Sequence, residues 1–363
     1  MYMWRKNPFI SLFMGSMYNL PSPINISFMW NFGSLVGFFL VVQIVSGLFL
    51  TMHYCPSIDG AFASIVHLNH DVNYGWLLRY IHANGASFFL GLMYLHICRG
   101  VYYKRYYNTY AWLVGVLMLG VSMLTGFLGY VLPWGQMSFW GATVITNFIT
   151  AIPIWGVDIV KWVWGSYCVD NATLNRFYTF HFLFPFLLVV LSVGHLVFIH
   201  GTGSGNPVGG FSSSMKIPFW PYFGVKDILG FFVVVFLFML VVLFFPDVFG
   251  DPDNHHKANP MVTPVNIKPE WYFLFAYAIL RCIPNKGLGV LALVGSIVVF
   301  ALLPLGKVKF SGNLMYQVVF WSWAMNFCVL TWLGGCHVKV VFTYMAQVCG
   351  FLYFSLLFLL MVV

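Results

Sequence analysis

Charged residues are scarce in this sequence. Asp, Glu, Lys and Arg make up only 7% of its 363 residues, whereas a soluble domain carries about 25%. Hydrophobic residues contribute 61% and aromatic residues 20%. This shortage of charge excludes an ordinary soluble protein and indicates a chain that crosses a membrane many times. We therefore interpret the net charge of +8 as basic loops beside a membrane, not as a surface that binds nucleic acid.

Paired cysteine motifs are also missing. The seven cysteines form no Cys-x-x-Cys pair and no Cys-x-x-Cys-His sequence. The first absence argues against a cysteine metal site, and the second argues against a covalently attached c-type haem.

The long apolar stretches predict an all-α integral membrane protein with about eight transmembrane helices. The expected spans are 30–53, 76–102, 110–132, 173–200, 223–245, 288–305, 318–335 and 345–362. We predict surface helices in 136–167 and 270–283. Residues 1–210 would form an N-terminal four-helix bundle, and residues 211–363 a C-terminal four-helix membrane domain.

An even number of crossings puts both chain ends on one side of the membrane. That side would carry nine of the 17 Lys and Arg residues and a single acid, Asp227. Because basic residues favour the negative side of a membrane, we place the chain ends there.

Two of these spans each carry a pair of histidines. His82 and His96 are 14 residues apart. The same separation joins His181 and His195. Fourteen helical residues rise about 21 Å and fall about 40° short of four full turns, so each pair faces one direction at two depths. The two spans run parallel, and this predicts two stacked bis-histidine sites, His82 with His181 and His96 with His195. Two non-covalent b-type haems, with these histidines as ligands of the haem iron, fit such sites.

Glycines in the first and third spans repeat the 14-residue period. Gly33 pairs with Gly47 in this way, and Gly115 with Gly129. Glycine lets a flat ring approach the backbone because it has no Cβ. We expect Gly47 and Gly129 beside the first level, and Gly33 and Gly115 beside the second.

Two arginines stand near the ends of the second span. Arg79 lies three residues before His82, and Arg99 lies three residues after His96. At these positions an arginine can pair with a haem propionate.

Histidines inside a membrane have other uses. A haem-free transporter or channel with a proton relay would explain them, but it gives the glycines in register no role. A di-haem oxidoreductase with another electron donor, such as ascorbate, is a third alternative.

Several segments resemble one family. They read WLLRYIHANGASFFLGLMYLHICRG at 76–100, GYVLPWGQMSFWGATVITN at 129–147, PEWYFLFAYAILRCIPNKG at 269–287, DNATLNRF at 170–177, PYFGVKDILG at 221–230 and GDPDN at 250–254. Together they resemble mitochondrial cytochrome b, the di-haem subunit of quinol–cytochrome c reductase (respiratory complex III). The resemblance covers about residues 25–336.

The resemblance implies quinol oxidation on the positive side of the membrane. Glu270 would accept a quinol proton, because an apolar pocket raises the pKa of a carboxyl group. Tyr130 and Tyr277 would hydrogen-bond or gate nearby, and Gly141 would leave room for the quinol ring.

It also implies quinone reduction on the negative side. His200 and Asp227 would donate protons to the two quinone carbonyls. Four further polar residues would complete this quinone site: Asn31, Ser34, Ser204 and Lys226.

The same resemblance implies partners and a location. It predicts an iron–sulfur protein, a cytochrome c1-type subunit, ubiquinone, membrane lipid and a homodimeric complex in the mitochondrial inner membrane. Four histidines are atypical of the family, and we interpret them as solvated surface: His67, His70, His255 and His256.

Overall fold

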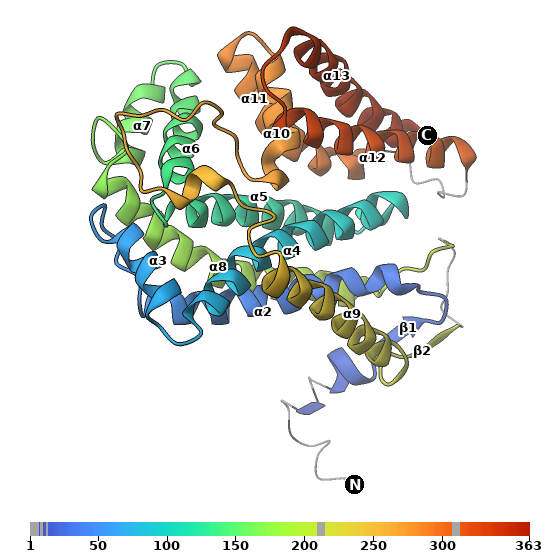
Figure 1. Cartoon of the computed structure of the whole chain (residues 1–363). Coiled ribbons are helices and arrows are strands. Elements are labelled where there is room, and N and C mark those ends of the chain that lie inside the picture. The colour runs from blue at the N-terminus through green and yellow to red at the C-terminus, as the bar shows by residue number, and fades with distance from the viewer. Residues whose placement is uncertain (1–6, 8–9, 12–13, 209–214, 307–312) are drawn as a thin grey trace.

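The protein is nearly all helix in the computed structural model, which describes residues 7, 10–11, 14–208, 215–306 and 313–363 (Figure 1). The long helices are α2 (Phe32–Thr51), α4 (Gly75–Tyr102), α5 (Thr109–Val131), α8 (Asn171–Thr202), α9 (Tyr222–Phe244), α11 (Lys286–Val298), α12 (Leu314–Gly335) and α13 (Val340–Val362). A 3₁₀ segment, η8 (Val299–Leu305), extends α11. A helix occupies each expected span, and the predicted all-α membrane fold is confirmed.

Shorter elements lie between the long helices. They are α3 (Ala61–His70), α6 (Gln136–Asn147), α7 (Gly156–Trp164), η7 (Trp271–Phe273) and α10 (Leu274–Cys282). The last four occupy the two regions expected to hold surface helices. The sequence did not predict two short strands, β1 (Pro21–Pro23) and β2 (Lys216–Pro218), which pair antiparallel.

Seven helices in the described parts of the chain are long and apolar enough to cross a bilayer. Helix α4 is not one of them, although its 28 residues would rise about 42 Å. It carries both predicted haem histidines of the second span and both arginines. Ionisable side chains at membrane depth are unfavourable and tend to be functional. The histidines and arginines of α4 are therefore candidate functional residues.

Sequence signals at both ends define helix α8. The hydroxyl of Thr173 accepts a hydrogen bond from the backbone N–H of Asp170 at 3.1 Å, in a capping box. Gly203 ends the helix with φ +78°, a conformation that side chains with a Cβ rarely adopt. These two signals set the ends of α8, so that one continuous helix holds both His181 and His195.

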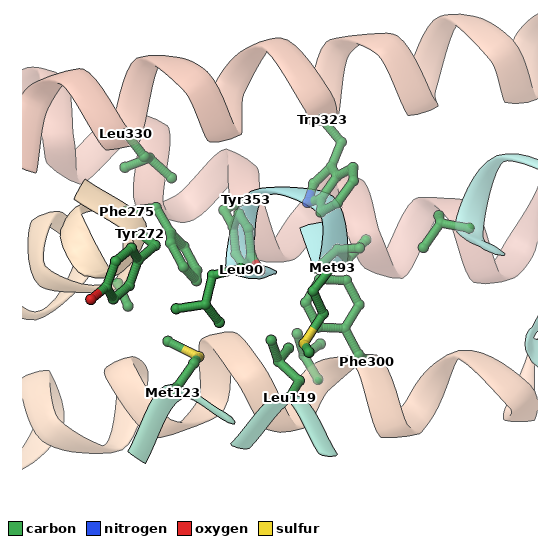
Figure 2. Packing of buried hydrophobic residues seen from close by; sticks show 14 of the residues in the cluster. Leu90, Met93, Leu119, Met123, Tyr272, Phe275, Phe300, Trp323, Leu330 and Tyr353 are labelled. Carbon is green, nitrogen blue, oxygen red and sulfur yellow. The ribbon is translucent and has the colours of Figure 1, made fainter. Parts of the chain in front are cut away.

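Helix packing sets the frame of the site. Helix α2 packs along α4, and α5 packs along α8, so four helices form a bundle (Figure 1). Leu90 from α4 and Met123 from α5 join a buried cluster that also holds Phe275, Trp323 and Tyr353 from the C-terminal half (Figure 2). This shared core fixes α4 and α5 against the segment that contains Glu270.

Candidate redox and quinone sites

The two histidine pairs face each other across the bundle. The ring centroids of His82 and His181 are 6.1 Å apart. Those of His96 and His195 are 6.3 Å apart. Because a metal–imidazole bond is about 2 Å long, two imidazoles on one metal ion have centroids roughly 6 Å apart. Each pair therefore has a spacing that would suit two imidazole ligands of one metal ion.

Backbone carbonyls orient the two histidines of α8. His181 Nδ1 lies 2.8 Å from the carbonyl oxygen of Thr125. His195 Nδ1 lies 2.7 Å from that of Ala111. A carbonyl only accepts, so each Nδ1 carries the proton and each Nε2 keeps its lone pair. This is the tautomer that a metal-ligating histidine needs.

Side chains contact the two histidines of α4. Ser46 Oγ donates to the carbonyl of Val42 at 2.6 Å, so it accepts from His82 Nδ1 at 2.9 Å. At His96 the partner is Arg99, whose Nη2 lies 3.2 Å from Nδ1. A guanidinium only donates, so ligation through His96 Nε2 requires Arg99 to turn to another acceptor.

Each predicted glycine lies against one histidine ring. The contacts are Gly33 with His96, Gly47 with His82, Gly115 with His195 and Gly129 with His181. A Cβ at Gly47 would lie 3.0 Å from His82 Cε1, and one at Gly129 would overlap the ring of His181. The bundle closes on the rings only because these positions lack side chains. The ring spacing and the glycines fit a haem at each level, and the tautomers of His82, His181 and His195 fit ligation through Nε2.

A cavity of about 480 Å³ lies beside the first level. Its lining includes His82, His181 and Arg79, and also Tyr130 and Glu270. The volume falls within the range of about 300–1,000 Å³ that is usual for ligand pockets. The structure thus brings the first histidine level and the predicted proton acceptor into one space.

Glu270 precedes η7 at the wall of this cavity. Burial raises the pKa of Glu270 to about 7, and the nearby Asp251 adds to the rise. A hydrogen bond from the Tyr130 hydroxyl and the positive charge of Lys268 lower the pKa less than burial raises it. A carboxyl group that exchanges its proton near neutral pH suits a general base.

Two other residues predicted for the quinol site lie outside the cavity lining. The Tyr277 hydroxyl donates to the carbonyl of Ile267 at 3.3 Å, and the Arg281 guanidinium lies 5.4 Å from the Tyr277 ring centroid. Gly141 is buried in α6, and a Cβ there would meet open space. The structure therefore joins Tyr130 with Glu270, but not Gly141 or Tyr277, in the cavity lining.

On the side that the sequence predicts to be negative, the starts of α2 and α9 meet. Ser34 Oγ lies 2.8 Å from Asp227 Oδ1, and Asn31 Nδ2 donates to the carbonyl of Lys226 at 2.7 Å. The Lys226 ammonium in turn donates to the carbonyl of Ile26 at 2.9 Å. Four predicted quinone-site residues are thus adjacent to each other and to Gly33.

His200 and Ser204 stand apart from this group. His200 lies near the end of α8, and Ser204 follows Gly203. None of the contacts described for residues 14–208 and 215–306 joins either residue to the Ser34–Asp227 pair.

Three of the histidines interpreted as solvated surface have defined surroundings. His70 and His255 line the 480 Å³ cavity. His67 forms an exposed pair with Asp71 at 2.8 Å. Ser46 was not among the residues predicted for either site. Its hydroxyl contacts His82 Nδ1, and its position next to Gly47 was the available signal.

Comparisons with known proteins agree with this geometry. Residues 17–203 match the family model described as Cytochrome b/b6/petB, and residues 257–354 match Cytochrome b(C-terminal)/b6/petD. The structure described as "Hyperthermophilic respiratory Complex III" is similar, with a TM-score of 0.92 and 31% sequence identity over 98% of this chain and 96% of that chain.

The fold and the paired histidines define a multi-pass membrane protein of the haem-binding, electron-transferring class. The chain belongs to the cytochrome b family. This assignment implies haem binding and favours an oxidoreductase over the haem-free transporter.

Proposed function

We propose that this chain oxidises quinol on the positive side of a membrane and reduces quinone on the negative side, as the core subunit of a quinol–cytochrome c oxidoreductase. Family membership and the match to a Complex III structure support the oxidoreductase subunit. The cavity shared by the first histidine level and Glu270 carries the proposal for the quinol site, and the contact between Ser34 and Asp227 supports a separate quinone site.

At the positive side, Glu270 accepts a proton from the quinol. The Tyr130 hydroxyl holds the carboxylate by a hydrogen bond, and the cavity lining keeps the ring of the substrate beside His82 and His181. The position of Glu270 in the same cavity as these histidines couples loss of the proton to loss of the electron.

Four histidines would hold two b-type haems, and Arg79 and Arg99 would pair with their propionates. When bound, these groups supply single-electron carriers at two depths about 21 Å apart along the helix. The chain sets the tautomers of His82, His181 and His195. It also sets the depth of the four histidines and surrounds them with apolar side chains. Electrons would pass from the positive-side level to the negative-side level.

At the negative side, Asp227 donates a proton to the quinone. Ser34 and Lys226 orient this carboxyl group through the contacts between α2 and α9. His200, near the end of α8, and Ser204, just after it, would complete the site when quinone binds. Proton release on one side and uptake on the other side then contribute to proton translocation.

The partners and the location follow from the same proposal. One quinol electron leaves for an iron–sulfur protein and a cytochrome c1-type subunit, within a complex that we expect to be homodimeric. Ubiquinone as the substrate and the mitochondrial inner membrane as the location remain predictions from the resemblance.

Optical spectroscopy of the purified complex tests the proposal. We expect two b-type absorbance components that quinol reduces, with inhibitors of the two quinone sites blocking entry and exit of electrons separately. A protein that lacks b-type absorbance, or whose absorbance does not respond to quinol, would contradict the proposal.

A further inference from the structure

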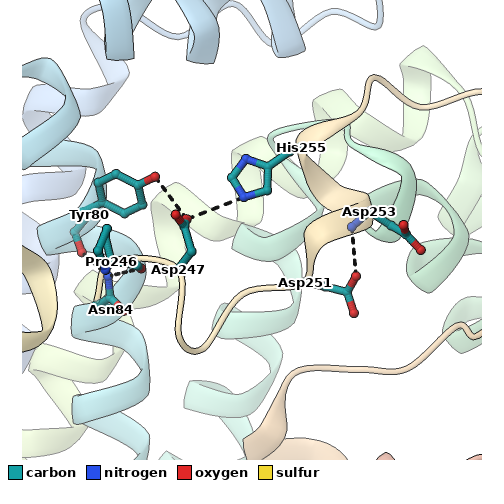
Figure 3. Close-up of polar contacts among 7 residues, drawn as sticks. All are labelled: Tyr80, Asn84, Pro246, Asp247, Asp251, Asp253 and His255. Carbon is teal, nitrogen blue, oxygen red and sulfur yellow. Dashed lines mark hydrogen bonds and ion pairs between the residues drawn. The ribbon is translucent and has the colours of Figure 1, made fainter. Parts of the chain in front are cut away.

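The 480 Å³ cavity has a second polar region besides Glu270. Asp247, Asp251 and His255 follow α9 in the chain and line the same cavity (Figure 3). None of them belongs to the quinol site proposed above. They line the same cavity as Glu270, and the segment after α9 contacts Tyr80 and Asn84 of α4.

Asp247 is the centre of this region. It accepts a hydrogen bond from the Tyr80 hydroxyl at 3.0 Å, and its Oδ1 lies 3.5 Å from His255 Nε2 (Figure 3). The side chains of Asp247 and His255 are 55% and 61% exposed. A carboxylate and an imidazole in contact therefore line the cavity and also reach solvent.

The position of Asp247 is fixed from α4. Asn84 Nδ2 donates to the carbonyl of Pro246 at 2.9 Å, and this bond holds the residue before Asp247 against α4 (Figure 3). Together with Tyr80, Asn84 gives the aspartate two anchors on one helix. The carboxylate thus has a defined place at the cavity, although it belongs to a loop.

Asp251 lines the same cavity but is not suited to exchange protons with solvent. Its side chain is only 12% exposed and pairs with Lys268 at 3.4 Å. It also accepts from the backbone N–H of Asp253 at 3.0 Å. Its negative charge is compensated in place, whereas the charge of Asp247 faces His255 and water.

Other charged and titratable groups surround Asp247. Arg79 interacts with it electrostatically from α4. His53 and His70 line the cavity from the segment after α2 and from α3, without a described contact to Asp247. The Asp247–His255 pair combines mutual contact, cavity lining and solvent exposure of more than half of each side chain.

We propose that Asp247 and His255 form the proton exit of the quinol site. The O–H bond of protonated Glu270 breaks, and water in the cavity passes the proton to the Asp247 carboxylate. The His255 imidazole takes the proton from Asp247 and releases it to solvent on the positive side. No electron moves in this step, and Glu270 returns to the form that accepts the next proton. The inference rests on the proposed function and adds the route that Glu270 needs for turnover.

The test uses Asp247→Asn in the intact complex, with Asp253→Asn as the matched control. Asp253 is a carboxylate of the same loop that does not line the cavity. We expect Asp247→Asn to slow quinol oxidation about tenfold, most strongly at acid pH, where solvent bases are scarcest. Added imidazole should restore the rate, because a small base can enter and take the proton. The control should keep the parent rate and pH profile.

The exit is ruled out if Asp247→Asn keeps the parent rate and pH profile, or if its loss is insensitive to imidazole while haem content is intact. If Asp247→Asn loses haem, His255→Gln decides instead, because it leaves the Tyr80–Asp247 bond intact. It should show the same acid-side slowing and rescue, and parent-like behaviour would overturn the proposal.

Glu270→Gln separates the two proposals. Unchanged quinol oxidation there contradicts the quinol site itself, whereas loss there beside parent-like Asp247→Asn contradicts only the exit.

Discussion

The two histidine levels share one frame but have different surroundings. Both have ring centroids slightly more than 6 Å apart, with two glycines against the rings. The level of His82 opens into a large cavity with a buried base, Glu270. The level of His96 instead borders the Ser34–Asp227 pair through Gly33. The repeated helices supply two similar histidine sites. The segments outside the repeat place a different carboxyl group near each of them, Glu270 near one and Asp227 near the other.

The largest expected effect comes from removing one level. His82→Ala leaves His181 without its opposite ligand, so the haem of the cavity level should be lost. We expect the b-type absorbance of the purified complex to fall by about half, because each level would hold one haem in the proposed function, and quinol oxidation to stop. His96→Ala should remove the other component instead. Unchanged absorbance of both components in either variant would contradict the assignment of ligands.

Removing the base should leave both levels intact and slow the chemistry. Glu270 has a pKa of about 7, so it is protonated below that pH and able to accept a proton above it. Quinol oxidation by the parent should therefore rise as the pH increases through 7. Glu270→Gln should lower the rate about 100-fold and abolish this rise, with normal haem spectra. A variant that keeps the rise would show that another group is the base.

The glycines test how tightly each level is closed. A Cβ at Gly129 would overlap the ring of His181, whereas one at Gly115 would lie 3.4 Å from His195 Cε1. Overpacking costs about 1–3 kcal/mol, so Gly129→Ala should weaken haem retention at the cavity level. Gly115→Ala, its partner in the same helix, should cost less than about 1 kcal/mol because the contact is nearly normal. Haem loss during thermal unfolding measures both, and equal losses would remove the distinction.

The regular part of the site was predictable from the sequence. A helix has a fixed rise and turn, so four histidines and four glycines at one period suffice to predict their mutual contacts. The structure pairs Gly47 with His82 and Gly33 with His96 as expected. Helical periodicity was therefore enough to predict which histidines and glycines lie together.

The irregular part was not predictable from periodicity. Asp247 meets Tyr80 across 167 residues, and a loop of prolines and aspartates has no period from which to infer this contact. The position of Ser204 likewise depends on how the chain turns after Gly203, which ends α8. Such contacts depend on the path of loops, whereas helical spacing predicts positions only as far as the helix ends.

The smallest expected effect concerns the one ligand that a hydroxyl orients. Ser46 accepts from His82 Nδ1 at 2.9 Å, and an acceptor there makes the imidazole a stronger electron donor. Ser46→Ala removes a hydrogen bond worth about 1 kcal/mol, which corresponds to roughly 40 mV for a one-electron couple. We expect the midpoint potential of the cavity-level haem to rise by about this much, with the other haem unchanged. Ser192→Ala is the matched control, because Ser192 also donates to the carbonyl four residues earlier, that of Leu188 at 2.7 Å, without a described contact to a histidine. Equal shifts in both variants, or a shift of both haems, would show that the hydroxyl of Ser46 does not tune His82.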